Sequence, residues 1–260
     1  MTDIKIRDMG KDDEYFVSTC SHINESDEID RSGERRLAWL KAMYSQGLRI
    51  KVSLCNGEHA GMLYMMPIEV SPWGPIGEDL MVIQCLFVLS KYKGNGIGKA
   101  LMIEAEEEAE RQNTKGIVVV AYYWDFWFMP ATFFEALGYE VVERAGETAL
   151  LWKVFDESAI APKLLSRRYQ CGRDEKKVVV DLYYNTACLT SDVEAERVRK
   201  VVDEYGDRVT LNEYNSCERE ILLRYETPRG IFVDGEEIFW GYEAPKEGVR
   251  EAIDKALKNK

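Results

Sequence analysis

The chain has 260 residues, a formal net charge of −12 at pH 7, and 46% hydrophobic and 31% charged residues. This length exceeds one compact core and predicts two domains, each with enough apolar residues for an interior. The acidic balance argues against nucleic-acid binding, which requires a basic surface. Six cysteines without paired short spacing argue against a zinc ribbon or a disulfide scaffold, so we expect reduced thiols and no metal.

The N-terminal residues carry charges throughout and form no long apolar run. We therefore expect neither a signal peptide nor a membrane span, and predict a cytoplasmic protein. Residues 4–7 alternate like a strand. Residues 12–21 and 34–45 have helical periods on either side of a polar stretch, 24–33. Residues 49–55 and 60–70 form a predicted hairpin around Asn56 and Gly57, a pair that tolerates the positive φ angles of a tight turn.

Strand and helix patterns then alternate as in an α/β domain that ends near residue 156. The apolar run 80–89 predicts a buried central strand. Further elements are expected as a helix at 99–113, a strand at 117–124, a short helix at 131–137, and strands at 139–143 and 149–155. Residues 157–176 lack a clean period and are expected to be a linker.

A second, smaller α/β domain is predicted at 177–260. Its expected strands are 177–184, 209–214, 229–233 and 237–241, and its expected helices are 192–204, 217–225 and 248–257. The predicted order is βαβαββα, with the last two strands joined by a turn at Asp234 and Gly235.

A glycine-rich turn lies between the central strand and the following helix. Such a turn lets backbone amides approach an anion, and the helix N-terminus adds partial positive charge. The spacing fits neither a Walker loop nor the dinucleotide-binding fingerprint. Gly94, Gly96 and Gly98 fit this use, although a tight turn without a ligand would explain them as well.

The stretch 86–101 closely resembles the main motif of the GNAT (GCN5-related) N-acetyltransferases, in which a strand precedes an Arg/Gln-x-x-Gly-x-Gly/Ala loop. Lys93 fills the first position of that loop, so the positive charge is kept and the guanidinium fork is lost. The resemblance implies acetyl-CoA as cosubstrate. The contacts that it implies come from the end of the strand, the turn and the start of the helix: Leu86, Phe87, Val88, Lys93, Gly94, Asn95, Gly96, Ile97, Gly98 and Lys99. The pyrophosphate of acetyl-CoA would lie on the amides from Gly94 to Lys99, and its pantetheine arm along the backbone of Leu86 and Val88, where the fourth strand splays from the fifth.

The segment 133–139 also resembles the family, and this extends the likeness over most of residues 1–155. The tyrosine that often protonates the departing thiolate in this family falls at Phe134, which has no proton to give. Tyr122, Tyr123 or a water would then donate. A base must also remove a proton from the acceptor amine, and the candidates are Glu78, Asp79, Asp125 and His59; the strand after Asp79 offers only Gln84 among polar side chains.

The segment 122–129 is unusually aromatic for a surface loop. With Met65, Met66 and Trp73 it could wall a pocket for a small-molecule or peptide amine. Core packing, or a contact between the two domains, would equally explain the aromatic residues.

In the second domain, Cys188 follows a buried strand and precedes a helix, a location that favours a thiolate. The element order resembles a minimal thioredoxin or glutaredoxin fold, with Ser191 in place of a second cysteine. By that resemblance, Thr227–Pro228 would be a cis-proline step that faces Cys188. The two domains together are similar to the YoaP-like proteins of bacteria and archaea.

The sequence therefore predicts an acetyl-CoA-dependent N-acetyltransferase that acts on a small-molecule or peptide amine. Two alternatives stay open. One is a thiol-redox or thiol-transfer protein that uses Cys188 with CoA as ligand, and the other is a non-catalytic CoA sensor. The sequence does not choose an acceptor or an oligomeric state.

Overall fold

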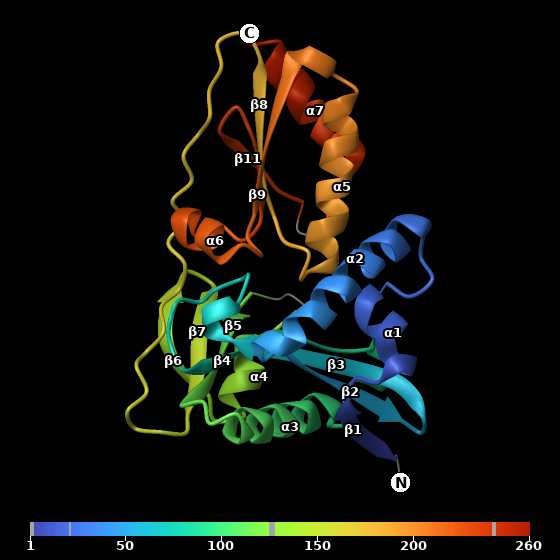
Figure 1. Cartoon of the computed structure of the whole chain (residues 1–260), viewed down its shortest axis with the longest axis vertical. Coiled ribbons are helices and arrows are strands. Elements are labelled where there is room, and N and C mark those ends of the chain that lie inside the picture. Colours follow the sequence, from blue (N-terminus) through green and yellow to red (C-terminus); the bar gives the residue numbers. More distant parts are fainter. Residues whose placement is uncertain (1–2, 21, 125–127, 241–242) are drawn as a thin grey trace. The chain divides into compact units, whose positions relative to one another are not determined.

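The computed structural model describes residues 3–20, 22–124, 128–240 and 243–260. The chain divides into two compact units (Figure 1). Unit 1 contains residues 1–23 and 40–165, and unit 2 contains residues 24–39 and 166–260. The domain ranges 1–156 and 177–260 stay a prediction, because unit 2 also takes in a segment from the N-terminal part of the chain.

Unit 1 is built on a seven-stranded sheet in the order β1-β2-β3-β4-β5-β7-β6. Every neighbouring pair is antiparallel except β4 and β5, which are parallel. The strands are β1 Ile4–Asp8, β2 Arg49–Cys55, β3 Glu58–Pro67, β4 Leu80–Val88, β5 Gly116–Tyr122, β6 Glu140–Ala145 and β7 Thr148–Val154. The predicted strands are thus confirmed, with small shifts at their ends.

The central strand β4 keeps one neighbour along its length and loses the other. Its ladder with β3 runs from Met81 to Val88, but its ladder with β5 ends at Ile83 opposite Val119. Between the pairs Tyr64–Cys85 and Met65–Ile83, Gln84 is an extra residue and forms a bulge. A bulge bends and twists its strand, and this explains why β4 and β5 part at this point.

Helix α3 (Ile97–Arg111) packs on one face of this sheet, with α4 (Ala131–Glu135) on the same side (Figure 1). Its buried positions, among them Ile97, Leu101 and Ala105, repeat every four residues as predicted. On the other face, Phe16 of α1 (Glu14–Thr19) lies 5.7 Å from the ring of Phe87. Further along that face Ile68, Leu80, Val82, Val118 and Leu150 form a separate apolar cluster.

A buried ion pair joins α3 to β2. Lys51 is 3% exposed, and its Nζ lies 3.2 Å from the Oε2 atom of Glu108. The Glu108 carboxylate also accepts hydrogen bonds from Arg111 and Gln112. Burial raises the pKa of the Glu108 carboxyl, but the hydrogen bonds from Arg111 and Lys51 outweigh it and lower the pKa to about 2. The helix that begins at the glycine turn is therefore held to the sheet at its far end by charge.

The two helices expected on either side of the polar stretch 24–33 are confirmed, but the expected start of the second helix at residue 34 is wrong, because it begins inside that stretch. Helix α2 covers Asp27–Met43, and the Ser26 Oγ accepts a hydrogen bond from the Ile29 amide at its start. Polar residues of its first turns have partners within unit 2: Glu28 pairs with Arg197 at 2.8 Å and Arg31 with Glu196 at 3.0 Å. Further along the helix, the buried Arg36 donates to the carbonyl of Ala187. The periodicity of apolar residues alone misses the first turns of this helix, because ionic contacts replace some of the apolar ones there.

Unit 2 has a four-stranded sheet in the order β11-β10-β8-β9, with α5 and α7 packed on one face (Figure 1). Strands β8 and β9 are parallel and the other pairs antiparallel. The elements are β8 Val178–Tyr184, α5 Leu189–Asp203, β9 Val209–Asn215, α6 Arg219–Tyr225, β10 Gly230–Val233, β11 Glu236–Ile238 and α7 Lys246–Leu257. The predicted order βαβαββα is confirmed; the predicted end of the last strand at Gly241 lies outside the described residues.

The expectation of a cis-proline at Thr227–Pro228 is wrong. The Thr227–Pro228 bond is trans, and the cis bond found among the described residues is Gly74–Pro75. In the described part of the chain, none of the helices has the length and apolar content that a membrane crossing demands.

The Glu108 pair gives a stability prediction. The Glu108→Gln variant should lose roughly 2 kcal/mol of unfolding free energy at neutral pH, because a carboxyl with a lowered pKa stabilises the fold above its unfolded-state pKa. That difference from the wild type should fade as the pH drops from 4.5 to about 2. Urea denaturation of both proteins over this range measures it. The matched control is Glu107→Gln, an exposed neighbour on the same helix, which should cost at most about 0.5 kcal/mol. Equal losses in the two variants would contradict the prediction.

Candidate active site

The glycine turn adopts a backbone that favours glycine. Gly94 and Gly96 have φ angles of +82° and +77°, and Gly96 is the residue that immediately precedes α3. A Cβ added at either glycine would meet no atom of the described chain within 4 Å. The turn therefore presents bare backbone to open space, as an anion cradle requires.

The start of α3 provides backbone amides outside the helical ladder. The first helical hydrogen bond of α3 runs from the Ala100 amide to the Gly96 carbonyl at 3.0 Å. The amides of Ile97, Gly98 and Lys99 come before it and have no acceptor within the helix. The helix dipole adds partial positive charge at this end. The side chains of Lys93, Asn95 and Lys99 are exposed here, while Ile97 is buried and anchors the helix on the sheet.

The turn is also tied to the β2–β3 hairpin. Glu58 accepts hydrogen bonds from Lys91 Nζ at 2.8 Å and from the Tyr92 hydroxyl. The Asn95 side chain donates to the Tyr92 carbonyl at 3.0 Å, and the Leu89 amide donates to Ala60. These contacts hold the loop at the C-terminal end of β4, where the strand has separated from β5.

The residues of β4 that were predicted to contact the cofactor have side chains that pack on the two faces of the sheet. Leu86 packs in the core beneath α3, and Phe87 packs on the opposite face against Phe16. Val88 is half-buried against the same core as Leu86. A ligand that runs along this part of β4 would therefore meet the backbone more than these side chains.

The candidate proton donors differ in their surroundings. The Tyr123 hydroxyl donates to Glu135 at 2.6 Å, and this hydrogen bond raises the pKa of Tyr123. Tyr122 is half-buried at the end of β5, with its ring 5.8 Å from that of Trp124. Phe134 is fully buried between Phe133 and Tyr139, so a hydroxyl added to its ring would be buried as well.

The candidate bases lie in different parts of unit 1. Glu78 and Asp79 precede β4, at the end opposite the glycine turn, and Asp79 pairs with Lys115 at 2.9 Å. The nine residues of β4 separate them from the turn by about 30 Å. His59 contacts the buried Asp13 at 2.7 Å and stacks on Phe16. Asp125 lies outside the described residues. None of the described candidates lies where β4 and β5 part.

The predicted acceptor pocket is partly wrong. Met65 and Met66 are both fully buried, and Met65 lies in the core beneath α3, so neither lines an open pocket. Trp73 is half-buried and Trp124 is 51% exposed. The Tyr122 amide donates to the Met129 carbonyl at 3.0 Å, so these two described residues of the aromatic segment lie next to each other.

In unit 2, Cys188 is the residue that precedes α5, and polar side chains surround it. Its Sγ lies 3.1 Å from Thr190 Oγ1, which accepts a hydrogen bond from Arg229. Arg229 is fixed by the buried Glu194 at 2.8 Å, and its guanidinium is within electrostatic range of Cys188. Ser191 is fully buried and accepts from the Asn185 amide, so it has a structural contact. The sequence indicated Cys188 but not Thr190, Glu194 and Arg229. Thr190 and Glu194 are ordinary polar residues of a helix in the sequence, and Arg229 is distant from Cys188 in the chain.

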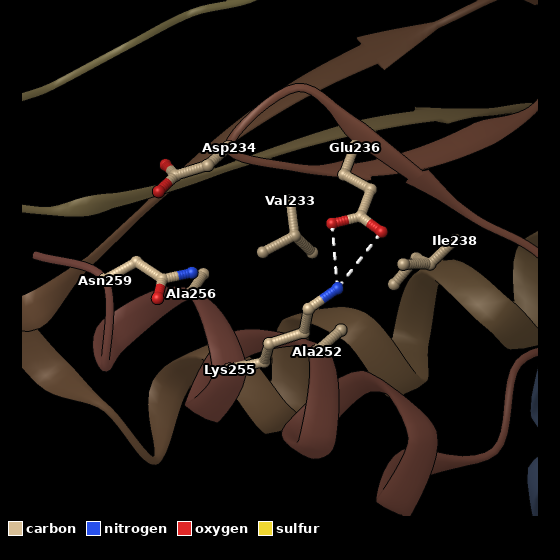
Figure 2. Close-up of a pocket in the computed structure, with 8 residues that line it drawn as sticks. All are labelled: Val233, Asp234, Glu236, Ile238, Ala252, Lys255, Ala256 and Asn259. Carbon is tan, nitrogen blue, oxygen red and sulfur yellow. Dashed lines mark hydrogen bonds and ion pairs between the residues drawn. The ribbon is translucent and has the colours of Figure 1, made fainter.

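A separate hollow of about 270 Å³ lies between the β10–β11 hairpin and α7 (Figure 2). Its apolar wall includes Val233 and Ile238, and Lys255 reaches Glu236 across it at 3.1 Å. Cys188, Thr190 and Arg229 are not among its lining residues. Within the described residues, no group of three or more His, Cys, Asp and Glu side chains is arranged to hold a metal.

Comparison with known families defines the class of the first unit. The model of the acetyltransferase (GNAT) domain matches residues 49–141, a segment that contains β4, the glycine turn, α3 and β5. The chain therefore carries a GNAT acetyltransferase domain, and the predicted class of enzyme, an acyltransferase, is confirmed.

Individual proteins also resemble this chain. The chain is 24% identical over 185 residues to the uncharacterized N-acetyltransferase YoaP of Bacillus subtilis (strain 168), which covers 69% of this chain and 70% of the relative. A PaiA N-acetyltransferase from Thermoplasma acidophilum, solved with coenzyme A, aligns with 59% of this chain and 99% of its own at 16% identity and a TM-score of 0.44. A GNAT family acetyltransferase from Brucella melitensis, solved with acetyl-CoA, aligns with 62% and 94% at 16% identity and 0.42.

The cysteines give a prediction that needs no substrate. Burial raises the pKa of the Cys217 thiol to about 11, so its thiolate is scarce at neutral pH, whereas Cys171 is exposed and Cys188 half-buried. In native protein, iodoacetamide should modify Cys171 and Cys188 well before Cys55, Cys85 and Cys217. Peptide mass spectrometry over a time course ranks the sites, and labelling of the urea-unfolded chain gives the reference rates. Labelling of Cys217 as fast as Cys188 would contradict the prediction.

Proposed function

We propose that unit 1 binds acetyl-CoA and transfers its acetyl group to the amine of a small molecule or a peptide. The observation that carries the proposal is the combination of two features at one point of the sheet. The β4–β5 ladder ends at Ile83, and beyond the end of β4 the turn with Gly94 and Gly96 has open space around it and leads directly into the first amides of α3. The name of the Bacillus relative, an N-acetyltransferase, agrees with this.

The residues present fit the cosubstrate. The amides from Gly94 to Lys99 would bind the pyrophosphate, with Lys93 and Lys99 as nearby positive charges. The backbone of Leu86 and Val88 would bind the pantetheine arm, since β4 has no β5 partner there. These assignments use main-chain atoms, and they explain why the side chains of Leu86 and Phe87 can be buried elsewhere.

The cosubstrate supplies an acetyl thioester: the lone pair of the amine attacks its carbonyl carbon, a C–N bond forms, the C–S bond breaks, and the proton lost by nitrogen balances the one gained by sulfur. We propose that Tyr122 or Tyr123 gives the sulfur its proton. Tyr123 is the weaker candidate, because its hydroxyl already donates to Glu135 and its pKa is raised. With Phe134 buried, α4 supplies no hydroxyl at the position that is often tyrosine in the family.

A Gly96→Glu variant tests the phosphate site. A carboxylate at this position would occupy space next to the amides and repel the pyrophosphate, so CoA affinity should fall about 100-fold, the equivalent of one hydrogen bond to a charged group. Isothermal titration with CoA measures it.

The matched control is Gly146→Glu. Gly146 also has a positive φ, +61°, and open space around a Cβ, but it lies in the β6–β7 turn. It should bind CoA like the wild type. Unchanged affinity in Gly96→Glu, with an intact fold by circular dichroism, would refute the assigned site.

For unit 2 we propose a thioredoxin-like fold with Cys188 as a reactive thiol. The strand order β11-β10-β8-β9, with β8 and β9 parallel, supports the fold. The chain of contacts from Glu194 through Arg229 and Thr190 to Cys188 supports the reactivity, because the Thr190 hydroxyl lies 3.1 Å from the sulfur and the positive charge of Arg229 contacts that hydroxyl. The thiolate would attack a small-molecule disulfide, form a mixed disulfide and release the other half as a thiolate. The trans bond at Pro228 is a departure from the resemblance.

The Thr190→Val variant tests this second role. Valine keeps the shape and removes the hydroxyl that lies 3.1 Å from the sulfur, so the iodoacetamide rate of Cys188 should fall about threefold to tenfold, the equivalent of one lost hydrogen bond. Thr210→Val, a half-buried threonine on β9, is the control and should leave the rate unchanged. An unchanged rate in Thr190→Val would show that the contact does not activate the thiol.

A further inference from the structure

Gln84 has an unusual hydrogen-bonding state. It is the extra residue of the β4 bulge, only 9% of it is exposed, and its Oε1 atom has no hydrogen-bond partner in the described part of the chain. A buried polar atom without a partner costs about 1–3 kcal/mol. Such an atom requires a physical explanation, and an absent partner that donates to it is the simplest.

The orientation of the Gln84 amide follows from its neighbours. The Ser71 hydroxyl lies 2.7 Å from the carbonyl oxygen of Gly74, which can only accept, so Ser71 must donate to it. The same Ser71 oxygen lies 2.8 Å from the Gln84 Nε2 and, having given its proton away, must accept. Gln84 therefore presents its NH₂ group to Ser71, and its carbonyl oxygen is the unpaired end.

The location of this oxygen restricts what it can bind. Val82, two residues earlier on β4, belongs to the apolar cluster with Ile68, Val118 and Leu150. Gln84 is the next residue after Ile83, at which the ladder with β5 ends. An acceptor atom thus lies between a buried apolar cluster and the point where the two strands part, and its complement is an N–H or O–H donor.

We infer that the Gln84 Oε1 binds the acceptor, by accepting a hydrogen bond from the N–H of a primary amine as it approaches the thioester. The inference rests on the proposed function, which puts the thioester arm along β4 directly after this residue. Ser71 is then a positioning residue, since it fixes the amide so that the oxygen and not the nitrogen faces the substrate. An amide oxygen orients the nitrogen lone pair but does not remove the proton, so the proton leaves through another group or solvent.

Methylamine is a suitable probe, because the smallest primary amine requires no pocket beyond the one that receives its nitrogen. In ¹⁵N-labelled full-length protein saturated with CoA, the side-chain amide signal of Gln84 is assigned by its loss in Gln84→Met. That signal should shift when methylamine is added. It should not shift with tetramethylammonium, which has the charge but no N–H. No shift with methylamine, or equal shifts with both, would overturn the inference.

Kinetics provide the second readout. Gln84→Met, of similar size but without the acceptor, should lower kcat/KM for methylamine about tenfold, the equivalent of one hydrogen bond, and leave the KM for acetyl-CoA unchanged. Gln84→Glu keeps an acceptor oxygen and should retain more activity than Gln84→Met. CoA titration and circular dichroism verify that both variants fold.

The outcomes separate the two claims. An amide shift without acetyl transfer by the wild type supports amine binding by Gln84 and contradicts the proposed transfer. Acetyl transfer that is undiminished in Gln84→Met supports the proposed function and overturns the role of Gln84.

Discussion

The constraint on which unit 1 depends is the incomplete pairing of β4. Along β3 the strand is paired up to Val88, but along β5 it is paired only up to Ile83. The bulge at Gln84 bends the strand, so the backbone edge beyond it faces away from β5. A sheet that continued its ladder would satisfy these groups internally. The separation of β4 from β5 is therefore a consequence of one inserted residue. The glycine turn and α3 come next in the chain, at the unpaired end of β4.

Charged contacts fix what apolar packing alone would leave adjustable. Lys51 and Glu108 join α3 to β2, and Glu58 ties the glycine turn to the β2–β3 hairpin through Lys91. The first pair is buried, so each partner depends on the other; the second is exposed and worth little energy by itself. In unit 2, Glu194 likewise holds the side chain of Arg229 by a hydrogen bond. These ionic contacts orient side chains and loops at both candidate sites.

The candidate site could be predicted from the sequence to the extent that it consists of backbone. The apolar run before the turn, the glycines at 94, 96 and 98, and the helical period after them are local patterns, and the structure has all three elements. Side-chain roles were less accessible. Met65 and Met66 were expected to wall a pocket and are fully buried, because adjacent residues of a central strand point to opposite, covered faces. The state of Gln84 depends on Ser71 and Gly74, in a different segment, and no spacing reveals it.

The sequence by itself determined the alternation of strands and helices, the glycine turn with its positive φ angles, and the order βαβαββα of unit 2. Each of these depends on neighbours a few residues apart. Only the tertiary structure decided that residues 24–39 group with unit 2, that β4 and β5 part at Ile83, and that Thr190 and Arg229 lie near Cys188. These features depend on contacts between residues far apart in the chain. Hydrogen bonds and ion pairs of that kind leave no periodic pattern, since a charged residue has the same appearance in a sequence whether its partner is solvent or a buried carboxylate.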